Sequence, residues 1–200
     1  MKKIFPVFII AFISVTAYCQ EVKQERTVET NQKKSYAVGA GMIFTTDFEW
    51  DMLDAYTINF SYNIRKHAFS LGPMAVINRW SSNNLNEPII GVNGSYQFYP
   101  SPDGKLQFFV HYSFNYFQFK ETIFYQPDLV NGKHKLFTNV LGVGIKLFPF
   151  RKNKFYLLQS NGFALLRSAS DYWNSTSNTI VTDKSYGYGL TFTLSINYVL

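Results

Sequence analysis

Large apolar residues alternate with small or polar ones along most of the chain from Ser35 to Leu200. The clearest example is the stretch AYTINFSYNI, residues 55–64, in which Tyr, Ile and Phe occupy every second position. Because successive side chains of an extended chain point to opposite faces, this period of two predicts β-strands with one apolar and one polar face. No window of helical periodicity competes with the alternation, so we expect an all-β domain.

The alternation predicts eight strands, at residues 36–46, 55–64, 67–78, 89–99, 106–117, 137–148, 155–166 and about 188–200. The connections between them are alternately long (47–53, 79–88, 118–136, 167–185) and short (65–67, 100–105, 149–154). An even number of strands with short turns at one end and long loops at the other is typical of a membrane-spanning barrel. The sequence therefore predicts an eight-stranded, antiparallel, up-and-down transmembrane β-barrel.

The distribution of charge indicates which face lies inside. The predicted strands contain almost no Asp, Glu, Lys or Arg, with Lys146 as the clear exception. A soluble barrel would carry such residues on its outward face, because that face must be hydrated. We therefore expect the large residues, such as Phe60, to face lipid and the small polar ones, such as Asn59, to fill a narrow lumen. By the same parity, Lys146 is expected to point into the lumen with Gly142 and Gly144.

The N-terminus has the features of a secretory signal peptide. Two lysines precede an apolar run from Ile4 to Val15, and a cleavage site with small residues follows before Gln20. We expect residues 1–19 to be removed, residues 20–34 to form a flexible periplasmic leader and residues 35–200 to form the barrel. Cys19, the single cysteine, is either lost with the signal peptide or lipidated. If it is lost, disulfides and thiol chemistry are excluded from the mature chain.

Charge and aromatic residues add three expectations about the surroundings of the protein. The net charge is +6, and no basic run is interleaved with stacking aromatics, so the sequence gives no indication of nucleic-acid binding. The short turns are basic and can meet anionic phospholipid headgroups if they face the periplasm; their basic residues are Arg65, Lys66, Lys105, Arg151, Lys152 and Lys154. Aromatic residues flank the short turns or lie in or beside the long loops, where we expect interfacial anchors: Phe98, Phe148, Phe150, Phe155 and Tyr156, and Trp50, Trp80 and Trp173.

The whole predicted domain resembles the small outer-membrane β-barrel domain family of Gram-negative bacteria, of the OmpA/OmpX eight-stranded type. The terminal GLTFTLSINYVL resembles the assembly signal of that family through Gly189, Phe192 and Leu194, although Leu200 replaces the usual final aromatic residue. The resemblance implies an outer-membrane location, contact with outer-membrane lipids and lipopolysaccharide, insertion by the barrel-assembly machinery and a possible extracellular partner of the loops. It implies an architecture and not an activity.

One pair of residues has the types needed for catalysis. His111 and Ser113, in HYSFN, share one face of a strand, and the pair resembles the His-x-Ser of outer-membrane lipid A deacylases, which implies acyl-ester hydrolysis. However, no Asn directly follows Ser113, and the nearest downstream acid, Glu121, falls in a predicted loop. Parity places the pair in the lumen with Gln107 and Asn115, so we expect a hydrogen-bond network and no catalytic residue.

Neither metal ligation nor a cofactor is expected. The loop TTDFEWDMLD carries Asp47, Glu49, Asp51 and Asp54, which could bind a divalent cation, but a solvated acidic loop is the commoner case. His67 and His134 lie in a turn and a loop and are expected to be exposed to solvent.

The sequence therefore predicts a non-enzymatic outer-membrane barrel with a structural or surface-interaction role through its long loops. Two alternatives are a lipid A deacylase-like enzyme using His111 and Ser113, and a soluble exported lipocalin-like ligand binder.

Overall fold

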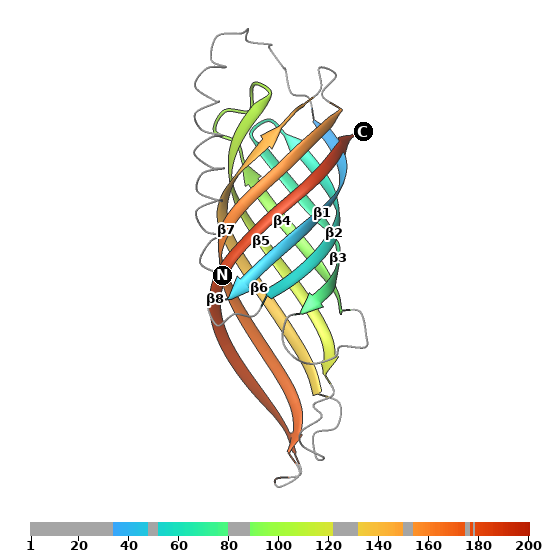
Figure 1. The fold of residues 1–200 in the computed structure, drawn as a ribbon, viewed down its shortest axis with the longest axis vertical. Coiled ribbons are helices and arrows are strands. Elements are labelled where there is room, and N and C mark those ends of the chain that lie inside the picture. The colour runs from blue at the N-terminus through green and yellow to red at the C-terminus, as the bar shows by residue number, and fades with distance from the viewer. Residues whose placement is uncertain are drawn as a thin grey trace. The chain divides into compact units, whose positions relative to one another are not determined.

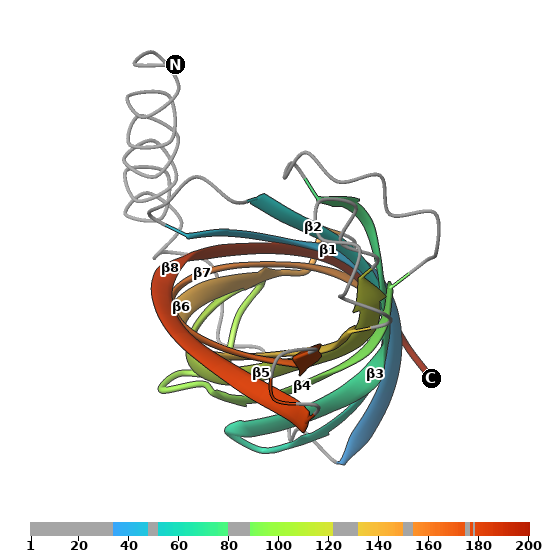
Figure 2. The same ribbon diagram turned by 90° about the horizontal axis from the view of Figure 1, so that it is seen from below.

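The computed structural model describes residues 34–47, 52–79, 89–121, 132–149, 154–174, 177 and 179–200. Eight strands form one closed barrel in chain order, each antiparallel to its neighbours, and β1 pairs with β8 to complete the ring (Figures 1 and 2). The strands are β1 (Ser35–Asp47), β2 (Met52–Ile64), β3 (His67–Arg79), β4 (Ile89–Phe98), β5 (Leu106–Glu121), β6 (Gly132–Leu147), β7 (Phe155–Asn174) and β8 (Thr179–Val199). The predicted fold is confirmed.

The predicted signal peptide and most of the predicted leader lie outside the described residues. Within the described ranges, no helix is long and apolar enough to cross a membrane.

The last four strands are longer than predicted at the loop end. The β5–β6 ladder continues to the pair Glu121 and Gly132, and the β7–β8 ladder continues to Asn174 and Thr179. Much of the expected loops 118–136 and 167–185 is therefore strand, and β7 and β8 project beyond the ends of β1 to β4 (Figure 1). Beyond the lipid both faces of a strand can meet water, so the alternation that marks a strand in the sequence is lost there.

The register of the strands shifts by ten residues when paired positions are followed once around the barrel. Paired positions followed around the wall run through Leu190, Phe163, Leu141, Tyr112, Tyr96, Phe69, Tyr62 and Tyr36. The circuit returns to Leu200, one residue after the end of β8, whose backbone N–H donates to the Tyr36 carbonyl at 2.9 Å. A stagger of ten residues over eight strands, spaced about 4.8 Å apart, corresponds to a strand tilt of about 40°.

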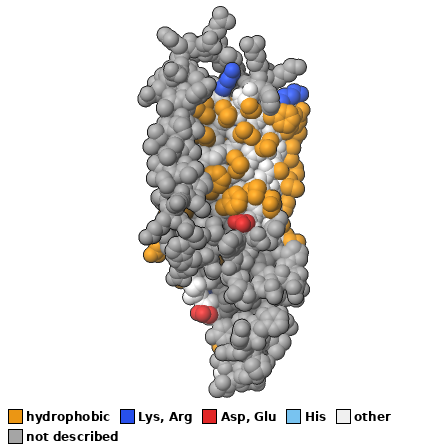
Figure 3. Space-filling view, viewed as in Figure 1, with side chains coloured by type: hydrophobic (Ala, Val, Ile, Leu, Met, Phe, Trp, Pro, Cys, Tyr) orange, Lys and Arg blue, Asp and Glu red, His pale blue; other side chains and the backbone are white. Residues whose placement is uncertain are grey.

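The two faces of each strand are oriented as predicted. In β2, Tyr56, Ile58 and Phe60 are 44, 53 and 62% exposed on the outside, whereas Thr57 is 2% exposed inside. On the face in view in Figure 3, hydrophobic side chains gather on the described part of the barrel wall, between basic side chains at one end and acidic ones toward the other. The predicted apolar exterior is therefore confirmed.

The exterior is not uniformly apolar. Asn139, Gln159 and Asn161 also fall on the outward face by register. The Tyr112 hydroxyl, on the neighbouring strand, donates to Asn139 Oδ1 at 2.5 Å, so this amide has a partner on the barrel surface.

The apolar belt has the height of a membrane interior. On β8, outward Leu190, Leu194 and Ile196 are exposed and lie between Tyr188 and Tyr198. Tyr188 and Tyr198 are ten residues apart, which at about 3.4 Å per residue and a tilt of about 40° spans roughly 25 Å. This is the height of the apolar band of outer-membrane barrels, with an aromatic residue at each boundary.

Two glycines on β6 make room for lumen side chains. A Cβ on Gly142 would lie 2.6 Å from His111 Nε2, and one on Gly144 would lie 2.8 Å from Phe109 Cε2. Both distances are shorter than any normal contact, so these glycines relieve crowding in a narrow interior.

Candidate functional site

The lumen is the site on which the sequence-based hypotheses converge, and its side chains form three layers. A turn-end cluster of buried residues closes the end with the short turns: Ala37, Ala68, Tyr99, Phe109, Phe148, Tyr156 and Leu158. A loop-end cluster lies toward the other end: Ile43, Ala55, Met74, Val76 and Phe117. The predicted lumen of small and polar side chains is therefore correct in part, because large apolar side chains such as Phe109, Phe117 and Met74 also point inward toward the two ends.

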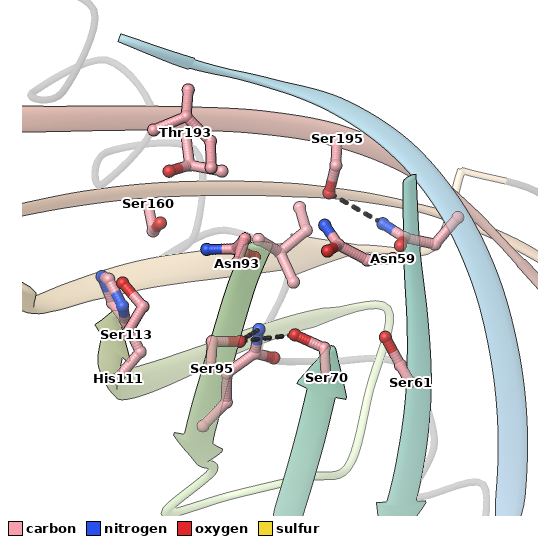
Figure 4. A pocket seen from close by; sticks show the side chains of 14 residues that line it. Asn59, Ser61, Ser70, Asn93, Ser95, His111, Ser113, Ser160, Thr193 and Ser195 are labelled. Atoms are coloured by element: carbon pink, nitrogen blue, oxygen red, sulfur yellow. Dashed lines mark hydrogen bonds between the residues drawn. The ribbon is translucent and has the colours of Figure 1, made fainter. Parts of the chain in front are cut away.

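The middle layer is a polar chamber with little free space. Ser, Asn, Thr and His side chains from six strands point toward one another around a cavity of about 40 Å³ (Figure 4). Since one water needs roughly 10–15 Å³ by this measure, the cavity can hold about three water molecules. The space is too small for a substrate or a permeating solute of drug-like size.

Hydrogen bonds between strands stabilise this chamber. Ser70 and Ser95 share a bond of 2.6 Å between β3 and β4, and Asn93 Nδ2 donates to Asn115 Oδ1 at 2.6 Å between β4 and β5. Such bonds satisfy polar groups that are removed from water, so they hold β3, β4 and β5 together at this level. Of the four residues expected in a lumen network, Asn115 takes part in these bonds.

His111 and Ser113 both lie in this chamber, side by side on β5 (Figure 4). They are 5% and 9% exposed, and among the described residues His111 Nε2 has no hydrogen-bond partner. No carboxylate lines the chamber within the described ranges. The side chain of Glu121, the acid considered from the sequence, is not among those described. The pair therefore faces the lumen and not the lipid in which an acylated substrate would lie.

Lys146 is buried in the turn-end cluster, as parity predicted. Its Nζ lies 4.2 Å from the ring centroid of Tyr156 and 5.2 Å from those of Tyr99 and Phe148. In the part of the chain that the structure describes, no carboxylate forms an ion pair with Lys146. The ammonium is therefore stabilised by the faces of three aromatic rings, an interaction worth about 2 kcal/mol or more when desolvated.

Tyr99 connects the turn-end cluster to the polar chamber. Its hydroxyl donates to Gln97 Oε1 at 2.6 Å, and Gln97 Nε2 is 3.5 Å from Ser95 Oγ. Burial, together with the neighbouring Tyr156, raises the pKa of the Tyr99 hydroxyl well above its usual value. The phenol therefore stays neutral, and it contributes its ring face and not a negative charge to Lys146.

Two predictions about aromatic anchors are wrong. Phe148 and Tyr156 were expected at the lipid interface, but they are 7% and 2% exposed and point into the barrel, where they enclose Lys146. The physical reason is the alternation of side chains along each strand. Both residues fall on inward-facing positions, and there their rings contact the Lys146 ammonium. Phe155, by contrast, is exposed, and its ring centroid lies 4.8 Å from that of Tyr198 on the exterior.

The prediction of an exposed His67 is also wrong. Its ring is partly buried on the barrel exterior, its Nδ1 lies 2.8 Å from the Tyr96 hydroxyl, and its centroid is 5.5 Å from that of Phe98. His67 therefore belongs to the aromatic boundary near the short turns.

The remaining candidates are only partly described. Trp50, Trp80, Glu49 and Asp51 lie outside the described residues, and the side chains of Trp173, Asp47 and His134 are not among those described. Within the described part of the chain, no group of three or more His, Cys, Asp and Glu side chains is placed to hold a metal ion.

Comparison with known proteins gives matches in structure alone. No protein-family model matches the chain, and no curated protein matches its sequence. Among solved structures, Neisserial surface protein A is 7% identical, with a TM-score of 0.46 over 82% of this chain and 96% of that one. The N-terminal barrel domain of Pseudomonas aeruginosa OprF is 12% identical, with a TM-score of 0.48 over 84% and 100%. The outer membrane protein AlkL, solved in DMPC bilayers, is 12% identical, with a TM-score of 0.49 over 88% and 94%.

The identification rests on the molecule's own architecture. The wall is closed, so no strand edge within the lipid is left unpaired. The exterior carries an apolar belt roughly 25 Å high with aromatic boundaries, and the interior is filled with polar and apolar side chains. The chain is therefore an integral β-barrel of the outer-membrane type, with eight strands and a filled lumen.

Proposed function

We propose that this protein has a non-enzymatic, structural or surface-interaction role in the outer membrane, exerted through the strands that project beyond the lipid. The observation that carries the proposal is the filled lumen. The lumen cavity between the described strands has a volume of about 40 Å³, which is too small for an acyl chain. The surface at the loop end is then what remains available for a partner.

That surface is built around a two-stranded ribbon, residues 168–174 of β7 paired with residues 179–185 of β8. Ser168 and Ser185 share a hydrogen bond of 2.6 Å, and Thr182 Oγ1 donates to Asp171 Oδ1 at 2.8 Å. Cross-strand pairs of this kind stabilise a ribbon with both faces in water. Ile180 is 69% exposed there, an apolar side chain that the ribbon itself does not bury.

In this proposal the protein has three kinds of partner. Outer-membrane lipids and lipopolysaccharide surround the belt, the barrel-assembly machinery inserts the chain, and an extracellular partner contacts the ribbon. None of these contacts requires a cofactor or a metal.

The test compares three complemented strains that lack the native gene. One carries the wild type, one carries Ser113→Ala, and one has residues 170–183 replaced by Asn-Gly, which joins the strands by a two-residue hairpin turn. Heat-dependent gel mobility shows whether each barrel is folded in the membrane. We expect Ser113→Ala to restore every phenotype, and the shortened ribbon to fold but to lose cell-surface adhesion and aggregation phenotypes.

Three results would contradict the proposal. Lipid A acylation that depends on Ser113 would establish the lipid-modifying enzyme. Recovery of the wild type in the soluble periplasmic fraction would favour the lipocalin-like binder. Full cell-surface adhesion and aggregation in the strain with the shortened ribbon would show that the ribbon has no part in the proposed function.

A further inference from the structure

The two ends of the barrel differ in charge. At the end with the short turns, five basic side chains are exposed and form what we call the basic rim: Lys34, Arg65, Lys66, Lys105 and Lys154. Asp103 is the one acidic side chain described at that end. At the loop end, the described basic and acidic side chains are balanced: Lys135, Arg167 and Lys184 against Asp54, Asp171 and Asp183. Figure 3 shows this difference on the face in view, with Lys and Arg at one end of the hydrophobic belt and acidic side chains toward the other.

The basic rim follows the circumference of the barrel. Lys34 precedes β1, Arg65 and Lys66 form the β2–β3 turn, Lys105 precedes β5, and Lys154 precedes β7. Arg65 adopts a left-handed backbone conformation, with φ of 51°, which makes this two-residue turn possible. Since the charges are spread over separate turns of a closed ring, they match a surrounding shell of ligands better than a single bound molecule.

Aromatic rings lie directly beside the basic rim on the exterior. The centroids of Tyr36 and Tyr62 are 5.2 Å apart near Lys34, and Lys154 Nζ lies 5.9 Å from the ring centroid of Tyr198. Such rings favour the depth of the lipid headgroups, so the cations next to them lie at the level of the lipid phosphates.

We propose that the basic rim binds the phosphate groups of anionic phospholipids, such as phosphatidylglycerol, in the membrane leaflet next to the short turns. Each Lys or Arg side chain near an anionic membrane surface is attracted to the negative charge of the lipids, and this attraction falls off within a Debye length. The proposal requires the barrel to span a bilayer but is independent of any role of the ribbon at the other end.

The test measures how strongly spin-labelled lipids associate with the purified full-length protein in phosphatidylcholine bilayers. Electron paramagnetic resonance gives the fraction of labelled phosphatidylglycerol or phosphatidylcholine that is immobilised at the barrel surface. At low salt, we expect the wild type to bind phosphatidylglycerol about two- to fivefold more strongly than phosphatidylcholine, because the exposed cations attract the anionic headgroup. The preference should fall in 0.5 M NaCl, an ionic strength at which the Debye length is only about 4 Å.

Two matched variants locate the site. Lys66→Gln/Lys105→Gln/Lys154→Gln removes three cations of the basic rim, and Lys135→Gln/Arg167→Gln/Lys184→Gln removes three from the loop end. We expect the first variant to lose most of the preference and the second to retain it, with both folded by the gel-mobility test. A wild type without preference would overturn the proposal, and so would equal losses in the two variants. Loss in the loop-end variant alone would assign the selectivity to the opposite leaflet and would equally refute it.

Discussion

An arginine placed at the centre of the belt should destabilise the barrel far more than the same residue at its edge. Leu141 and Leu147 provide a matched pair, because both are outward-facing leucines on β6, with 65% and 37% of their surface exposed. Leu141 lies between Tyr112 of β5 and Phe163 of β7, and Leu147 lies between Leu106 and Leu157. Neither position has a charged residue directly opposite.

The depth of each leucine follows from the stagger. Leu190 is eight residues from Tyr198, roughly 21 Å along the membrane normal at a tilt of about 40°. The ladder from Leu190 through Phe163 to Leu141 descends roughly 3 Å per strand toward the short turns, because the strands are tilted. Leu141 therefore lies roughly 14 Å from the level of Tyr198, near the middle of the belt, and Leu147 lies close to that level.

We expect Leu141→Arg to reduce the free energy of unfolding by about 2–4 kcal/mol and Leu147→Arg by about 0–1 kcal/mol. The difference arises because arginine at the edge reaches the headgroups, whereas at the centre it must be desolvated or must distort the bilayer. The assay is reversible urea unfolding in phospholipid vesicles, followed by tryptophan fluorescence and gel mobility and extrapolated linearly to water. Equal losses for the two variants, within about 0.5 kcal/mol, would refute the assigned depths.

Two further predictions concern the lumen and use the same unfolding assay. Lys146→Ala should cost about 2–4 kcal/mol because it leaves a cavity among three aromatic rings, whereas Lys146→Met fills the space and should cost under about 1.5 kcal/mol, since the lost cation–ring contacts are offset by no longer burying a charge; equal costs would show that the fit of this side chain is unimportant. Gly142→Ala should cost about 1–3 kcal/mol because its Cβ would clash with the Asn161 backbone oxygen and lie 2.6 Å from His111 Nε2. Gly187→Ala should change stability by less than about 0.5 kcal/mol, since its nearest neighbour would be Leu166 Cβ at 3.9 Å; a similar loss at both glycines would argue against a crowded lumen.

The strands within the lipid could be predicted because lipid imposes a strict period of two. The short connection predicted at residues 100–105 is also present, and Gly104 within it has a φ of 96°. The loop-end extensions of β5 to β8 could not be predicted in this way. In residues 179–185, Ile180 and Lys184 both lie on the outward face, so the pattern no longer separates an apolar face from a polar one.

Which residues face the lumen could be predicted only by following the alternation of side chains to the end of each strand. The alternation correctly placed His111, Ser113 and Lys146 inside the barrel. The same count places Phe148 two residues beyond Lys146 on the inward face, but its position beside a turn suggested an interfacial anchor. The grouping of Tyr99, Phe148 and Tyr156 around the cation could not be predicted, because it depends on which strands the closed ring brings together.

The most direct test of the central claim asks which methyl groups touch lipid. Protein with protonated Ile, Leu and Val methyl groups, in nanodiscs, would be examined for nuclear Overhauser effects to lipid acyl-chain protons. We expect cross-peaks from outward Ile58, Leu141 and Leu194, which are 53, 65 and 44% exposed, and none from inward Ile43 and Val140, which are 3 and 0% exposed. Acyl-chain contacts from the inward pair, or water contacts in place of lipid contacts from the outward three, would contradict the orientation of every strand in the barrel.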